Sequence, residues 1–155
     1  MTDVIMLFLK FTLDNEEYAF DTSNVVEITP LVDLKPVPNS EDFIVGIMNY
    51  RGSPIPIIDL SRIILGREFS HNMSTRIIIS NTANGKMIGL IIEHIEGMVK
   101  KSAVDFVNPN TESNTTSYLG NIAIDHETMI QTINIEELLK EKMPALSSIP
   151  GIAGI

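Results

Sequence analysis

The sequence predicts an all-β fold with only short helices, and three features of the 155-residue chain carry that prediction. Apolar and polar residues alternate from Leu7 to Leu13, which is the period-two pattern of a strand with one buried face. The pair Asn84-Gly85 lies between two isoleucine-rich runs and favours a hairpin turn, because both residues tolerate a positive φ. The apolar runs at 43–50 and 55–58 are short and bounded by Gly and Pro, as strands are.

The first half of the chain is predicted to hold a hairpin, further strands and one short helix. In order, we expect strands at 7–13 and 18–20, a helical turn at 21–24, a strand at 25–28, a proline-rich loop at 30–41, strands at 43–50 and 55–58, and a helix between Asp59 and Gly66. Pro54 and Pro56 place the strand at 55–58 at a sheet edge or at a strand start, because proline donates no ladder hydrogen bond.

The second half repeats this arrangement. We expect a hairpin of strands at 76–80 and 87–92, a short Val/Ile strand within a few residues of it, a mobile polar loop at 108–117, strands at 119–124 and 129–134, a helix at 135–143, and a flexible tail at 144–155. The segment 57–64 resembles the segment 132–139, and each reads as a strand end, an Asp or Asn cap and a short helix. The repeat predicts two small β subdomains, residues 10–66 and 75–140, which pack on each other and leave a groove between them.

Composition excludes several classes of function. The net charge of −9 disfavours nucleic acid or an anionic membrane as the main partner, because binding to phosphates requires a basic surface. The chain has no cysteine, hence no disulfide framework and no thiol nucleophile, which suits a cytoplasmic location. No segment approaches the roughly 18 apolar residues of a membrane span, so we expect no membrane insertion.

Catalysis and cofactor binding have no support in the sequence. None of the common nucleotide-binding or nucleophile motifs is present. His71, His94 and His126 lie in three different elements and lack the spacing of metal ligands. We therefore expect a protein without catalytic residues, metal or cofactor.

Arg51 is the best candidate for an interaction residue. It lies at a predicted turn between two apolar strands, where Gly52 can adopt a positive φ and Asn49 can bond the local backbone. A lone arginine contributes little to such a turn, whereas its guanidinium can bind a carboxylate through two hydrogen bonds. Arginine is also enriched at the energetic centres of protein interfaces.

Four motifs in order carry a resemblance to a known family. They are FTLDNEEYAFDTSNVVEI, the run from Gly46 to Leu60 (G-x-x-N-x-R-G-x-x-x-P-x-x-D-L), the run from Gly89 to Ile92, and the pair formed by Tyr118-Leu119-Gly120 and Asn134 to Leu139. This set, which covers about residues 7–140, resembles the CheW family of bacterial chemotaxis coupling proteins. The resemblance implies two intertwined five-stranded SH3-like barrels around a shared core, which agrees with the repeat.

The resemblance also implies partners and interface residues. Family members are non-catalytic adaptors that connect the cytoplasmic tip of a chemoreceptor to the regulatory domain of the histidine kinase CheA. By position, the residues for receptor and kinase coupling are Val25, Glu27, Ile28, Asn49, Arg51, Gly52 and Met98. Leu31 and Leu34 in the proline-rich loop fall on the kinase-facing surface. Val25, Ile28 and Met98 also fit plain packing in the core.

Two departures and two alternatives remain open at this stage. Glu93 stands where the family often has Asp, and Arg76 replaces a commonly apolar residue, so that it either tunes receptor choice or faces solvent. The same adaptor class also serves other pathways, such as type IV pilus or gliding motility, and only the partners distinguish these. A stand-alone β-barrel that binds a small ligand or a peptide is the second alternative.

Overall fold

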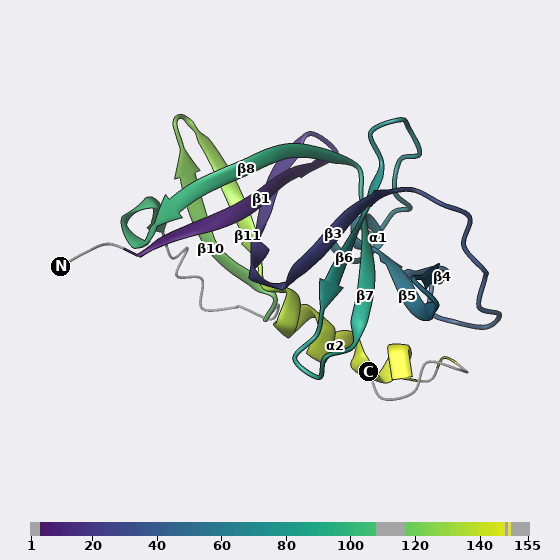
Figure 1. Ribbon diagram of the computed structural model, residues 1–155. Helices are drawn as coiled ribbons and strands as arrows, with labels where there is room; N and C mark the ends of the chain where they lie inside the picture. Colours follow the sequence, from purple (N-terminus) through teal and green to yellow (C-terminus); the bar gives the residue numbers. More distant parts are fainter. Residues whose placement is uncertain (1–3, 108–116, 148, 150–155) are drawn as a thin grey trace.

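The computed structural model describes residues 4–107, 117–147 and 149, and it confirms the all-β fold with short helices (Figure 1). Sheet A contains β1 (Ile5–Leu13), β2 (Glu16–Asp21), β8 (His94–Ser102), β9 (Phe106–Val107), β10 (Leu119–Asp125) and β11 (Thr128–Ile133). Sheet B contains β3 (Val25–Pro30), β4 (Ile44–Tyr50), β5 (Ser53–Asp59), β6 (Arg76–Asn81) and β7 (Met87–Ile92). The loop expected at 108–117 lies outside the described residues, apart from its last position.

The two halves of the chain exchange their hairpins between the sheets. Sheet A has the order β8-β1-β2-β11-β10-β9, and sheet B has the order β3-β6-β7-β5-β4. The hairpin β1–β2 of the first half therefore joins strands of the second half, and the hairpin β6–β7 of the second half joins strands of the first. This exchange is what intertwines the two SH3-like subdomains.

The internal repeat is visible in the strand order. The order β8-β1-β2-β11-β10 in sheet A corresponds strand for strand to β3-β6-β7-β5-β4 in sheet B. The boundary expected between residues 66 and 75 therefore separates the two halves of the repeat. It does not separate the two sheets, because each sheet contains strands from both halves. Sheet A exceeds the expected five strands because the two-residue strand β9 pairs with β10.

The core explains why strands β6 and β7 are continuously apolar. Ile78 on β6 packs into the largest apolar cluster, which draws on strands of both sheets. Its neighbours Ile77 and Ile79 pack into a second cluster within sheet B. Both faces of these central strands are thus buried, and the alternation typical of half-exposed strands disappears.

Strand β5 lies inside sheet B, between β7 and β4. Its parallel pairing with β7 begins at Ile57, beyond both Pro54 and Pro56. Pro54 is the second residue of β5, so the expected strand start is confirmed for it, whereas Pro56 is the fourth and is paired with Ile47 of β4. The expected position of the strand at a sheet edge is wrong. Gly89 faces Ile57 in this pairing, and a Cβ there would collide with the Ile57 side chain.

Two helices follow β5 and β11, as the repeat predicts. The helix α1 (Leu60–Leu65) begins after Asp59, whose carboxylate accepts hydrogen bonds from the amides of Ser61 and Arg62, and it ends at Gly66 with φ of 74°. The helix α2 (Ile135–Ser147) begins after Asn134, whose side chain accepts a hydrogen bond from the Glu137 amide at 3.1 Å. Among the residues that the structure describes, no helix is long and apolar enough to cross a membrane.

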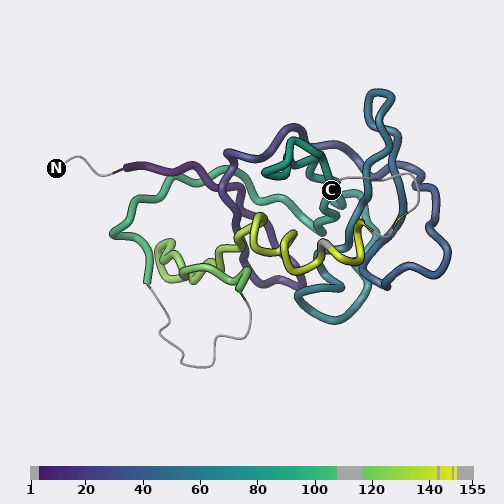
Figure 2. The backbone as a smooth tube through the Cα atoms, turned by 90° about the horizontal axis from the view of Figure 1, so that it is seen from below, coloured from purple at the N-terminus to yellow at the C-terminus, as the bar shows by residue number. Residues whose placement is uncertain are grey.

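The expected end of α2 and start of the flexible tail require a correction. The helix does not stop at Met143 but continues through Pro144 to Ser147. Leu146 and Ile149, with 0% and 3% of their surface exposed, pack into the shared core. Burial of these side chains outweighs the backbone hydrogen bond that Pro144 cannot donate. The helix lies along the bottom of the molecule in Figure 1 and is seen from below in Figure 2.

Candidate interaction site

The turn between β4 and β5 presents Arg51 on a strained but well-supported backbone. Arg51 has φ of 51° and Gly52 has φ of 86°. The Asn49 side chain accepts a hydrogen bond from the Gly52 amide at 3.0 Å, as expected from the sequence. A positive φ is common for glycine but unusual for arginine. The strain at Arg51 was not foreseen, and it is consistent with a functional rather than a structural reason for arginine here.

Glu27 on β3 binds this turn directly. Its carboxylate oxygen accepts a hydrogen bond from Tyr50 Oη at 2.7 Å and from Arg51 Nη2 at 2.9 Å. The hydrogen bond to Glu27 raises the pKa of Tyr50 above its ordinary value. The Arg51 guanidinium also lies over the Tyr50 ring, 5.2 Å from its centroid. Tyr50 is a member of the site that sequence reasoning missed, because it reads as part of the local apolar core.

The ion pair leaves most of the arginine accessible. The side chain of Arg51 is 75% exposed and that of Glu27 is 39% exposed. Such an exposed pair contributes less than about 1 kcal/mol to folding. Its effect is to hold the guanidinium in one place, with most of its donors free for a partner.

Strand β3 also carries apolar side chains on either side of Glu27 in the sequence. Val26 and Ile28 are 41% and 38% exposed, while Val25 is half-buried and packs against the shared core. A register irregularity between Val25 and Glu27 interrupts the pairing of β3 with β6. Val26 is thus a second missed site residue, and its alternation with Ile28 is the signal that could have found it.

Met98 lies on the other sheet. It is 51% exposed on the edge strand β8, where it is paired with Leu9 of β1. The structure therefore brings four of the predicted residues together at one corner of sheet B: Glu27, Asn49, Arg51 and Gly52. Ile28 lies beside Glu27 on β3. The structure places Met98 on a separate edge strand of sheet A.

The loop with Leu31 and Leu34 is anchored to the other edge of sheet B. Lys35 exchanges two backbone hydrogen bonds with Ile47 of β4, at 2.9 and 2.8 Å. Both leucines are half-buried and pack against the apolar cluster of sheet B. They also line a surface hollow of about 360 Å³. The other residues that line it are Val32, Asp33, Val45, Phe69 and His71.

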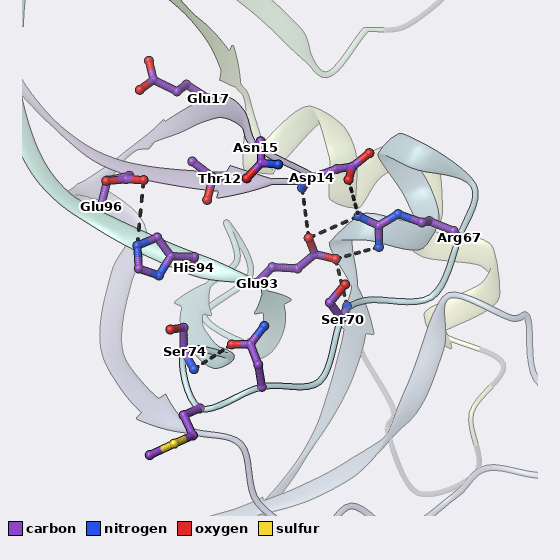
Figure 3. Close-up of a pocket in the computed structure, with 12 residues that line it drawn as sticks. Thr12, Asp14, Asn15, Glu17, Arg67, Ser70, Ser74, Glu93, His94 and Glu96 are labelled. Carbon is purple, nitrogen blue, oxygen red and sulfur yellow. Dashed lines mark hydrogen bonds and ion pairs between the residues drawn. The ribbon is translucent and has the colours of Figure 1, made fainter.

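A second polar centre surrounds Glu93 (Figure 3). Its carboxylate accepts hydrogen bonds from the amides of Asp14 and Ser70, the hydroxyl of Ser61, and both terminal nitrogens of Arg67, with donor–acceptor distances of 2.8 to 3.2 Å. Burial opposes ionisation of Glu93, but these donors outweigh it and lower the pKa to about 2. Sequence reasoning noted Glu93 only as a departure from the family, since its partners are distant along the chain.

The hollow beside Glu93 has a volume of about 810 Å³ and a mostly polar lining. His94 on its rim lies 3.8 Å from Glu96, and both side chains are exposed. Within residues 4–107, 117–147 and 149, the structure contains no group of three or more His, Cys, Asp or Glu side chains that could hold a metal ion. Arg76 donates to the carbonyls of Met73 and Thr75, which ties it to the preceding turn.

Comparisons with known proteins agree with this geometry. The model of the CheW-like domain family matches residues 7–143. The chemotaxis protein CheW of Klebsiella aerogenes is 32% identical over 142 residues, which cover 90% of this chain and 84% of that protein. The chemotaxis protein CheW of Thermotoga maritima is 27% identical over 135 residues, 86% of this chain and 87% of that protein. The crystal structure of the scaffolding protein TtCheW from Thermoanaerobacter tengcongensis has a TM-score of 0.78 at 27% identity, covering 88% of this chain and 94% of that one.

Proposed function

Because this chain belongs to the CheW family, we propose that it is a non-catalytic adaptor that couples chemoreceptors to the histidine kinase CheA in bacterial chemotaxis signal transduction. The observation that carries the proposal is the match of the family model over residues 7–143, which spans both sheets and most of α2. The chain would work in the cytoplasm, recruited to receptor arrays at the membrane.

The geometry of the Glu27–Arg51 corner supports a role in protein recognition. Glu27 on β3 fixes an exposed guanidinium through a 2.9 Å ion pair, and the residues on either side of Glu27, Val26 and Ile28, expose apolar side chains. A helix laid against such a surface would gain apolar contact from β3 and a defined register from the charges. We assign this corner, together with Met98, to the cytoplasmic tip of a chemoreceptor.

The loop of residues 31–34 supplies a second, separate surface. Leu31 and Leu34 line a surface hollow in the loop that follows β3, and the backbone bridge between Lys35 and Ile47 of β4 holds the loop in place. We assign this surface to the regulatory domain of CheA. Two surfaces on one rigid unit would allow the adaptor to hold both partners at once, and contacts that differ between the active and inactive kinase would let the receptor shift the kinase equilibrium.

The test is a reconstituted assay with membranes that contain chemoreceptor, purified CheA and this protein. We expect wild type to make kinase activity responsive to the receptor ligand, and Arg51→Glu to lose at least tenfold in receptor binding while remaining folded. Lys86→Glu is the matched control, because it is the same charge reversal at an exposed position in the β6–β7 turn of sheet B.

Two results would contradict the proposal. Full receptor-dependent kinase control by a folded Arg51→Glu variant would remove Arg51 from the interface. Failure of the wild type to bind either partner, together with a thermal shift caused by a small molecule or peptide alone, would favour a stand-alone binding module.

A further inference from the structure

We propose that the carboxylate of Glu93 is a latch that fixes sheet A against sheet B at the crossover between them. Glu93 lies between β7 of sheet B and β8 of sheet A. Its partner Asp14 belongs to the β1–β2 turn of sheet A, whereas Ser61, Arg67 and Ser70 belong to α1 and the connector that follows it on the side of sheet B. One side chain thus joins segments of both sheets (Figure 3).

The hydrogen bonds use both oxygens of the carboxylate. Oε1 accepts from the Asp14 amide at 3.0 Å and from Arg67 Nη2 at 3.2 Å. Oε2 accepts from Arg67 Nη1 at 2.8 Å, the Ser70 amide at 2.9 Å and the Ser61 hydroxyl at 3.0 Å. Glu93 is 6% exposed, so water cannot readily replace these donors. Removing the acceptor would leave the buried hydroxyl of Ser61 and several part-buried donors without this partner.

Apolar packing alone would not set the relative position of the sheets. The largest core cluster draws residues such as Leu9 from sheet A and Leu90 from sheet B, but burial of apolar surface has little directional preference. A buried carboxylate that is hydrogen-bonded on both oxygens requires strict distances and angles and therefore selects one arrangement. Arg67, which also lies 3.7 Å from Asp14 Oδ1, ties the connector to the β1–β2 turn a second time.

The latch gives the adaptor a means of holding its interface residues in one spatial relation. Glu27 and Ile28 lie on sheet B and Met98 lies on sheet A, so the distance between them depends on how the sheets are fixed. This consequence for signalling rests on the proposed function. The latch itself is a property of the isolated chain and is tested without any partner.

The absence of cysteine allows a direct measurement of the arrangement of the sheets. Spin labels attached at Lys86→Cys, in the β6–β7 turn of sheet B, and at Glu127→Cys, in the β10–β11 turn of sheet A, report the distance between the sheets by double electron–electron resonance. Both positions are exposed, and neither residue is a hydrogen-bond partner of Glu93. We expect a narrow distance distribution in the wild-type background and a shifted or clearly broadened one in Glu93→Gln.

Glu96→Gln is the matched control, because it removes the same charge from the lining of the same hollow without touching the five hydrogen bonds of Glu93. Its distribution should equal that of wild type. Should Glu93→Gln fail to fold by circular dichroism, Arg67→Gln takes its place, since it removes two of the five bonds. The proposal is overturned if the folded Glu93→Gln or Arg67→Gln variant keeps the wild-type distribution, or if Glu96→Gln broadens it equally.

Discussion

The carboxylate of Glu27 on β3 and the guanidinium of Arg51, the residue after β4, lie 2.9 Å apart, although β3 and β4 are at opposite edges of sheet B. Sheet B must therefore curl so that its two edges meet at this corner. Sheet A also curls, because Lys101 on its edge strand β8 binds Asp125 at 2.9 Å, and Asp125 ends β10, the strand next to the other edge. In each sheet, an ion pair connects strands that the hydrogen-bonded ladder does not.

The first prediction concerns Tyr50, whose pKa is raised by its hydrogen bond to Glu27. The carboxylate stabilises the protonated phenol, so Glu27→Gln should lower the pH at which Tyr50 ionises. Isotope-labelled NMR of the three tyrosines measures each titration separately. Tyr18 and Tyr118 should titrate as in wild type and serve as internal controls. An unchanged titration of Tyr50 would mean that this hydrogen bond is not formed in solution.

The second prediction concerns stability in acid. The pKa of Glu93 is about 2 in the folded protein against an ordinary value of 4.5. Because the folded-state pKa is lowered, the stabilisation from Glu93 is fully present above about pH 4.5 and is lost as the pH falls toward about 2. The shift corresponds to about 3 kcal/mol. Urea unfolding of wild type and Glu93→Gln at pH 7 and pH 3 should show a smaller difference at pH 3.

Glu96→Gln is the control for that measurement, because its carboxylate is exposed beside His94. It should change the free energy of unfolding by less than about 1 kcal/mol at either pH. A difference between wild type and Glu93→Gln that stays the same from pH 7 to pH 3 would show that Glu93 is not the group that titrates.

The third prediction concerns the part of α2 beyond Pro144. Leu146 is fully buried in the shared core, so Leu146→Ala should lower the free energy of unfolding by about 2 to 5 kcal/mol. Met129→Ala, which truncates a side chain that is 68% exposed, is the control and should be nearly neutral. Equal thermal midpoints of the two variants would mean that the end of α2 does not pack on the core.

The fourth prediction separates the two proposed surfaces. Leu34→Ser should weaken binding of CheA and spare the receptor, whereas Met98→Ala should weaken binding of the receptor and spare CheA. Leu34 lies in the loop after β3 and Met98 lies on sheet A, and both are partly or largely exposed, so neither change should unfold the protein. Binding of each variant to each purified partner by surface plasmon resonance gives four affinities. Parallel losses for both partners would argue against separate surfaces.

Local features were the ones most readily predicted. The cap at Asp59, the left-handed Gly66 and the hairpin turn at Asn84-Gly85 involve groups a few residues apart, and each is present. Strand β8 was harder, because the sequence indicated only a short strand there. The structure extends it over nine residues from His94 to Ser102, with Gly97 at φ of 143° and a register shift in β1 between Lys10 and Phe11.

The sequence by itself determined the elements, the repeat and the position of Arg51 at a turn, because periodicity, caps and turn residues act over a few neighbours. Tertiary structure alone decided the exchange of hairpins between the sheets and the continuation of α2 through Pro144. It also decided the contacts of Glu27 with Arg51 and of Glu93 with Asp14, which are 24 and 79 residues apart. Such contacts depend on how the whole chain packs around its core, and no local sequence pattern shows which distant residues will meet.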